Sequence, residues 1–209
     1  MKKPASMKGL EELGRVRLSP SFFMRDFLYS EIAQIENIGN IPDFPDLAIK
    51  SGEGLCQSIL EPLSEKLGRI SIRSGYRSPL INGIGCEKKY NCASNEKNFG
   101  GHIWDYRDDD GLLGATACIV VNSFIPYYER TGHWQSLAWW IHDHIPAYSE
   151  MCFFPKYAAF NITWRESEPR KEISSYITGS KGFLTKPGMG NHLNSHIQEY
   201  KELIQTLGL

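Results

Sequence analysis

The sequence predicts an α+β fold, with a small, mainly antiparallel sheet and helices packed on it. Segments with helical spacing of apolar residues dominate the first third of the chain. Short apolar or alternating segments, typical of strands, occur at 69–72, 115–121, 150–154 and 158–164. Helices and strands that are grouped, rather than strictly alternating, favour this class. A chain of 209 residues is also long enough to bury one sizeable core.

The N-terminal half contains two predicted helices separated by a loop. Ser19-Pro20 is typical of a helix start and predicts a helix over Phe22–Leu28. Residues 37–46 hold two prolines and a glycine and are predicted to be a loop. Apolar residues at helical spacing predict a long helix over Leu47–Leu67, which Gly68 would end.

The middle of the chain is predicted to contain two strands separated by a long loop. Residues 69–72 alternate polar and apolar side chains, and a turn over 74–79 follows. Residues 82–114 are polar and rich in glycine, so we expect a loop there. A loop of this length inside a domain is usually functional or disordered. Residues 115–121 form a short apolar run that fits a buried strand.

The C-terminal half is predicted to contain two helices and a pair of strands. Residues 133–144 fit a helix that Pro146 stops, and the strands 150–154 and 158–164 form a hairpin-like pair. Ser195 and Gln198 have the spacing of a capping box, before an amphipathic C-terminal helix. We expect an N-terminal extension over 1–17, a main domain over 18–170, and a C-terminal arm with that helix over 171–209.

The composition excludes several classes of protein. Hydrophobic residues make up 41% and aromatic residues 12%, which excludes a disordered chain. The formal net charge of -1 provides no general attraction for nucleic acid. No stretch of about 20 apolar residues could span a membrane. Residues 1–17 are basic and polar and do not resemble a signal peptide, so we expect a soluble protein.

The cysteine count leaves at least one thiol unpaired, because five is an odd number. Cys86 and Cys92 are close enough in sequence to close a small loop. In a cytosolic protein, however, a disulfide there would be unusual.

Three segments together resemble a known family. A helix start at Leu18-Ser19-Pro20 is followed by residues 60–63 (LEPL) in a long helix and by residues 70–78, which end in SGYRS. This order resembles the M15 zinc peptidases, the D-Ala-D-Ala carboxypeptidase group that shares its fold with the Hedgehog signalling domain. The resemblance covers roughly residues 18–166 and implies an M15/Hedgehog-type fold.

The resemblance also implies a metal site, in an altered form. His102 matches a zinc-binding histidine of the family. Cys118 stands at the position of the family's aspartate ligand, with an inserted loop of about residues 83–113 before it. Asn161 stands where the family has its third ligand, a histidine. Thiolate and imidazole both suit zinc, whereas a neutral amide oxygen is a weak donor.

Other residues could complete or replace that site. Asp105, His142 and His144 are possible additional ligands, and Glu150 or Asp105 could act as the general base, because the family's glutamate position falls on Phe153 or Phe154. Each has a plainer interpretation. Cys118 fits a small buried apolar residue, His142 and His144 fit the C-terminal end of a helix, and an Asp-rich loop is usually solvated.

The segment that carries the resemblance also supplies candidate substrate-binding residues. Arg77 could hold the terminal carboxylate of a peptide, since its guanidinium is a planar, bidentate donor. It could equally bind loop carbonyls. Ser74 and Tyr76 lie in the same segment, and Trp104 could stack on a sugar ring.

The resemblance implies a zinc-dependent, peptidoglycan peptidase-type protein that acts on or recognises cell-wall stem peptides. The alternative is a non-catalytic structural or wall-binding module of the same fold, such as a component of a phage tail or of an envelope assembly. Its partners would be peptidoglycan peptides or other protein subunits, with assembly through the C-terminal helix. Synthesis in a bacterial cytoplasm without a signal peptide fits either function, in a virion or in the cell envelope.

Overall fold

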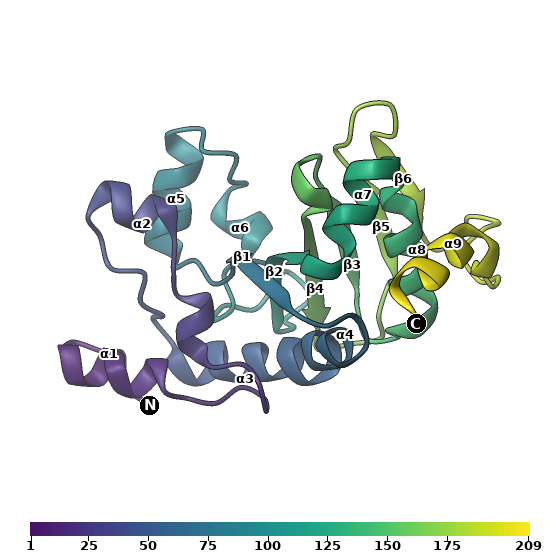
Figure 1. The fold of residues 1–209 in the computed structure, drawn as a ribbon. Coiled ribbons are helices and arrows are strands. Elements are labelled where there is room, and N and C mark those ends of the chain that lie inside the picture. Colours follow the sequence, from purple (N-terminus) through teal and green to yellow (C-terminus); the bar gives the residue numbers. More distant parts are fainter.

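The computed structural model describes residues 1–209, and a single six-stranded sheet forms its centre (Figure 1). The strand order is β1-β2-β4-β3-β5-β6. The strands are β1 Ile70–Ser74, β2 Gly114–Val121, β3 Glu150–Phe153, β4 Phe160–Arg165, β5 Glu172–Ser175 and β6 Gly182–Thr185. Every neighbouring pair is antiparallel except β3 with β5, which is parallel. The α+β class is therefore confirmed, with a mixed sheet.

Helices surround the sheet. They are α1 Met7–Gly14, α2 Glu31–Glu36, α3 Pro45–Leu55, α4 Glu61–Leu67, α5 Pro79–Glu87, α6 Asn95–Asn98, α7 Ile125–Thr131, α8 Trp134–His144 and α9 Ile197–Leu207. In Figure 1, α3 and α4 run beneath the sheet, while α7, α8 and α9 gather at the end that carries the C-terminus. None of these helices has the length and apolar character needed to cross a membrane.

The two faces of the sheet differ in chemistry because side chains alternate along each strand. One face of β2 and β4 presents Ala117, Ile119, Phe160 and Ile162, all fully buried. These side chains belong to one core cluster with residues of α3, α4 and α8. The opposite face of the same strands is largely polar, and it forms the candidate site described below.

The predicted long helix at 47–67 is confirmed, with a local distortion. It begins at Pro45, inside the predicted loop, and a π-helical turn at Cys56–Leu60 separates α3 from α4. Pro62 has no N–H to donate to the preceding turn, and the N–H of Glu61 bonds to the carbonyl of Cys56, five residues back. Gly68 ends the helix at φ 78°, as expected.

The predicted helix at 22–28 is largely wrong. Ser19 does not cap a helix, because its Oγ donates to the carboxylate of Glu61 at 2.8 Å. Only a short 3₁₀ turn forms, at Met24–Phe27, and the carboxylate of Asp26 accepts the N–H of Phe23 at its start. The predicted extension at 1–17 contains the helix α1, which Ser6 caps.

The predicted loop at 82–114 is only partly irregular. Ser78 caps α5 and Pro79 is its first residue, so the helix occupies the first residues of the predicted loop. The short helix α6 follows. Further along, Oδ1 of Asp108 accepts the N–H groups of Asp110 and Leu112, which holds the last turn before β2.

The C-terminal region differs from an extended arm. Strands β5 and β6 lie within 171–209 and extend the sheet through the β3–β5 pair. The predicted capping box at Ser195 and Gln198 is wrong, since α9 begins at Ile197 after His196. The N–H of His196 donates instead to Asp143 of α8 at 2.9 Å. The helix α7 was not predicted.

Candidate functional site

The polar face of the sheet presents two rows of side chains across its central strands. In one row, Thr116 of β2 lies opposite Thr163 of β4, which lies opposite Glu150 of β3, which lies opposite Glu172 of β5. In the next row the residues in register are Ser74, Cys118, Asn161, Cys152, Ser174 and Phe183. Residues in register on neighbouring strands point to the same side of a sheet.

A groove of about 560 Å³ lies over these rows, except at Ser74 and Cys118. The sheet forms its floor, and the segment from α6 to His102 together with residues 108–110 forms a wall. Its lining includes Glu96, Lys97, His102, Asp108, Asp109, Asp110, Thr116, Glu150, Cys152, Asn161, Thr163, Arg165, Arg170, Glu172 and Ser174. The groove is thus mainly polar and is built from segments far apart in the chain. We refer to it as the sheet-face groove.

His102 is held firmly at one side of this groove. The carbonyl of Gly101 accepts the N–H of Thr116 at 3.0 Å, and the carbonyl of His102 accepts the N–H of Arg77 at 2.8 Å. The ring nitrogen Nδ1 donates to the carbonyl of Gly75 at 2.9 Å. His102 is therefore fixed to both β2 and the segment after β1.

The other ring nitrogen of His102, Nε2, has no hydrogen-bond partner, although only 6% of the residue is exposed. Burial lowers the pKa of His102 to about 3, and the nearby charge of Arg77 acts in the same direction. The imidazole is therefore neutral, with its proton on Nδ1. Nε2 is left as a lone-pair acceptor in a residue that lines the groove.

Two glycines allow the loop of His102 to approach β2. A side-chain carbon at Gly114 would lie 2.0 Å from the carbonyl oxygen of Gly100, and Gly100 itself has φ 66°. Its N–H donates to the carbonyls of Ile103 and Tyr106. This close contact between the loop and β2 therefore requires glycine at both positions.

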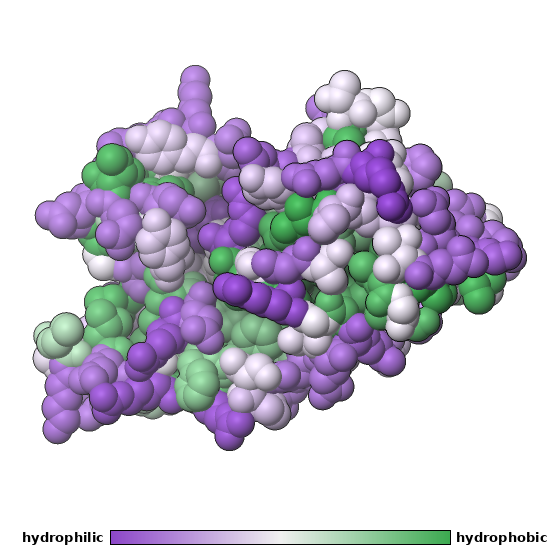
Figure 2. Space-filling view, viewed as in Figure 1, coloured by the Kyte–Doolittle hydropathy of each residue, from purple (hydrophilic) through white to green (hydrophobic).

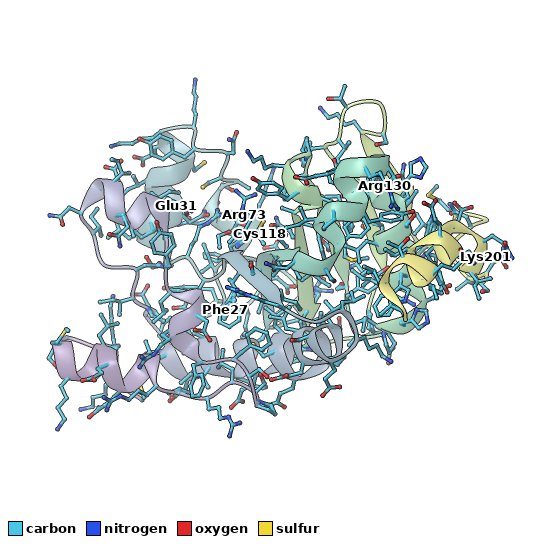
Figure 3. The ribbon with its side chains drawn as sticks, in the orientation of Figure 1. Phe27, Glu31, Arg73, Cys118, Arg130 and Lys201 are labelled. Atoms are coloured by element: carbon cyan, nitrogen blue, oxygen red, sulfur yellow. The ribbon has the colours of Figure 1, made fainter.

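Of the other two expected metal ligands, Asn161 lines the groove and Cys118 does not. Cys118 lies in register with Asn161 on the next strand. Figure 3 shows it in the same region as Arg73 and Glu31. Burial raises the pKa of the Cys118 thiol to about 11, although Arg73 and Arg77 act in the opposite direction. In the structure as it stands, Cys118 is therefore a protonated thiol beside the groove.

Glu150, one of the two candidate bases, lies on the floor of the groove. Burial raises the pKa of its carboxylate, the charge of Arg170 opposes this rise, and the neighbouring carboxylate of Glu172 adds to it. Nη1 of Arg170 lies 3.2 Å from Oε1 of Glu150. A carboxylate with a raised pKa in a groove is a reasonable candidate for proton transfer.

The other candidate base, Asp105, does not line the groove. It is fully buried, and its Oδ2 accepts the N–H groups of Asp43 and Phe44 at 2.7 and 3.1 Å, just before α3. Trp104 and Tyr76 are also fully buried. Nε1 of Trp104 donates to the carbonyl of Thr116 at 3.1 Å, so this indole is part of the core.

His142 and His144 belong to a different part of the molecule, on α8. The Nε2 of His142 donates to the carbonyl of His192 at 2.9 Å, and its Nδ1 accepts from the hydroxyl of Tyr148. Nδ1 of His144 donates to the carbonyl of Trp140 at 2.8 Å. Neither histidine lines the sheet-face groove.

Arg77 and Ser74 face a separate hollow of about 460 Å³ beside α2. Nη1 of Arg77 lies 3.4 Å from Oδ1 of Asn82 and 3.2 Å from Sγ of Cys92. Figure 2 shows that this side of the molecule is notched between the part that carries α2 and α5 and the part that carries α1. Cys92 and Cys86 are both free thiols.

No three His, Cys, Asp or Glu side chains come together in a geometry that could hold a metal ion. The residues of the groove fit zinc in part. His102 presents an unpartnered imidazole nitrogen, but Asn161 offers a neutral amide, and Cys118 lies outside the lining. Zinc therefore stays a prediction.

Three groove residues were not predicted from the sequence to belong to the site, namely Arg165, Arg170 and Glu172. The alternation of polar and apolar residues along β3 and β4 could have identified Thr163 and Arg165 as neighbours of Asn161 on one face. Glu172 had no such signal, because its strand was not predicted.

Comparisons with protein-family models, with curated proteins and with solved structures find no match for this chain.

Proposed function

We propose that the sheet-face groove binds an extended peptide, and that this peptide is a cell-wall stem peptide, as the resemblance to the M15 peptidases implies. The observation that carries the proposal is the groove itself. It lies on the polar face of the sheet, next to His102, which is the residue that matches the family's zinc-binding histidine. Under this proposal the fold is of the M15/Hedgehog type, and the protein works in the cell envelope or on a virion.

The dimensions of the groove suit a short peptide. From Thr116 to Glu172 the row crosses three strand spacings, which is roughly 14 Å. An extended chain covers that distance with about four residues. The groove offers a backbone ligand both acceptors and donors, including Nε2 of His102, the amide of Asn161 and the hydroxyl of Thr163.

Hydrolysis of the bound peptide is a second candidate function, favoured by one observation. Glu150 lies on the groove floor, and burial raises its pKa, which suits a general base. A zinc ion, when bound, would polarise the scissile carbonyl and lower the pKa of its water. Within the chain, His102 would supply one ligand to the ion, Glu150 would take the proton, and Asn161 would orient the peptide.

The test combines binding, cleavage and metal analysis of the purified full-length chain. We expect a synthetic stem pentapeptide to bind by calorimetry, and His102→Ala to weaken binding by tenfold or more while the protein stays folded by circular dichroism. Release of D-alanine, with stoichiometric zinc that His102→Ala loses, would establish the peptidase. Binding without zinc or cleavage would establish the recognition module. If no stem peptide binds the wild-type chain at millimolar concentration, the proposal is wrong.

A further inference from the structure

The sheet-face groove carries more negative than positive charge. Six carboxylates line it, from Glu96, Asp108, Asp109, Asp110, Glu150 and Glu172, against three cationic side chains from Lys97, Arg165 and Arg170. The two arginines already have partners. Arg165 pairs with Asp108 and Asp110, and Arg170 pairs with Glu150. The remaining carboxylates are left without a protein cation.

Glu172 is the carboxylate that stands out among these. It lies on β5 directly in register with Glu150 on β3, so two acidic side chains are neighbours on one face of the sheet. Like charges in this arrangement destabilise a sheet. Arg170 lies 3.2 Å from Glu150, whereas Glu172 makes no ion pair. It is half-buried in the groove rather than solvated on an open surface.

His102 gives an independent indication of a ligand. The residue as a whole is more than nine-tenths buried, it lines the same groove, and its Nε2 has no hydrogen-bond partner within the protein. Nε2 is not one of the buried polar atoms without a partner, so solvent reaches it and it is open to a ligand. Because the proton is on Nδ1, Nε2 can only accept, so a ligand that contacts it must supply a donor such as an N–H group. Both sides of the groove can therefore accept a hydrogen bond from a ligand donor.

We propose that the groove selects a peptide that carries a primary amine, with the ammonium group held between Glu172 and Glu150 and with a peptide N–H directed to Nε2 of His102. The proposal rests on the proposed function and makes it more specific: of the stem peptides, those whose diamino acid keeps a free amino group bind. An ammonium group supplies three donors and one positive charge, which matches the unpaired carboxylate.

The experiment compares two pairs of peptides on the full chain by calorimetry. One pair is a stem pentapeptide with lysine at its third position and the same peptide with that lysine Nε-acetylated. The other pair is an unrelated lysine-containing tetrapeptide with and without the acetyl group. The variants are Glu172→Gln and, as a matched control outside the groove, Glu65→Gln, an exposed carboxylate on α4.

We expect acetylation to weaken binding by about tenfold in the wild type, which is the usual effect of losing a charge-assisted hydrogen bond. Glu172→Gln should lower affinity for the amine peptide by a similar factor and leave the acetylated peptide unchanged. Glu65→Gln should change neither. If acetylation has no effect, or if Glu172→Gln weakens both forms equally, the amine selection is wrong.

The two pairs separate this inference from the proposed function. Amine-dependent binding of the unrelated peptide, without any binding of the stem peptide, would overturn the proposed function and keep the amine selection. Binding of both stem peptides with equal affinity would keep the proposed function and overturn the amine selection. If no peptide of either pair binds, both proposals are overturned.

Discussion

Buried histidines occur in two regions of this molecule, and the two regions use the ring nitrogens in opposite ways. In the sheet-face groove, His102 uses one ring nitrogen to fix its orientation and leaves the other without a partner. At the C-terminal end, His142 and His196 use both ring nitrogens within the protein. There Nδ1 of His196 bonds to Asp143 at 2.7 Å, and its ring stacks on Trp139 at 3.8 Å. We call this second region the C-terminal cluster.

The difference separates a ligand-binding arrangement from a structural one. Both regions contain histidine and carboxylate side chains, so the residue types alone do not distinguish them. In the C-terminal cluster every strong donor and acceptor of His142 and His196 is satisfied between α8, α9 and the preceding segment, so their bonds hold α9 in place. In the groove the bonding capacity is incomplete. Substitutions in the C-terminal cluster should therefore lower stability, and substitutions in the groove should weaken binding. The one exception is the backbone contact between Gly114 and Gly100 in the groove wall.

The largest effect is expected at that exception, from Gly114→Ala. The added carbon would lie 2.0 Å from the carbonyl oxygen of Gly100. The atoms nearest to it are all backbone atoms, so no flexible side chain could move aside to make room. We expect a loss of about 4 kcal/mol in the free energy of unfolding, measured with urea, as for a severe overpacking. Gly190→Ala is the control, because nothing lies near its added carbon. Similar stability of the two variants would contradict the close approach of the loop to β2.

Next in size is Asp143→Ala in the C-terminal cluster. The carboxylate accepts the N–H and Nδ1–H of His196 and the hydroxyl of Tyr200, so the change strands three donors at the start of α9. We expect a loss of about 3 kcal/mol in unfolding free energy. Asp109→Ala, which removes an exposed carboxylate without an ion pair, should cost less than about 0.5 kcal/mol. A small effect of Asp143→Ala would mean that the cluster does not hold α9.

The same contrast between local and distant partners explains what could be predicted from the sequence. Ser19-Pro20 and Ser78-Pro79 are the same dipeptide, and both are typical of a helix start. Ser78 caps α5 through the N–H of Ile81. Ser19 instead donates to Glu61, which belongs to α4 and lies 42 residues further along the chain. The local signal is equal in the two places, so only the folded structure decides between them. Ser195 also fails as a cap, because α9 begins only after His196, whose N–H bonds to Asp143 of another helix.

Elements whose burial follows from local pattern were predicted well. The apolar run of β2, the alternation of β3 and β4 and the helical spacing before Gly68 all gave elements of the right type. For the site, the sequence pointed to His102, Asn161 and Glu150, which do line one groove. Asp105, His142 and His144 could not be separated from them, because their partners Phe44, His192 and Trp140 bind through backbone atoms that no residue pattern reveals.

A third prediction concerns the pH dependence of the cluster. Burial lowers the pKa of His142 to about 4, below its ordinary value near 6.5. The folded protein therefore binds this proton less readily than the unfolded chain, and stability falls as the pH drops from about 6.5 towards 4. We expect His142 to account for about 2 kcal/mol of that fall, because its neighbours Lys171, His192 and His196 also oppose a charge there.

The variant that isolates this contribution is His142→Gln. Unfolding free energies measured between pH 7 and pH 4 should decline less steeply in the variant than in the wild type. Some slope persists in the variant, since burial also lowers the pKa of His102 and of His192. If the unfolding free energy declined equally steeply with falling pH in both proteins, residues other than His142 would cause the acid sensitivity.

Apart from the control variants, the smallest stability effect, and the sharpest contrast with the cluster, is expected from His102→Asn. This change removes a single buried hydrogen bond, from Nδ1 to the carbonyl of Gly75, so unfolding free energy should fall by only about 1 kcal/mol. Peptide binding should fall at least tenfold, because the free acceptor Nε2 is lost from the groove. Asp143→Ala should show the reverse, with a large loss of stability and unchanged affinity at a temperature where it is folded. If His102→Asn instead destabilised the protein as much as Asp143→Ala and left binding intact, His102 would be a structural residue like His142, and the distinction between the two regions would fail.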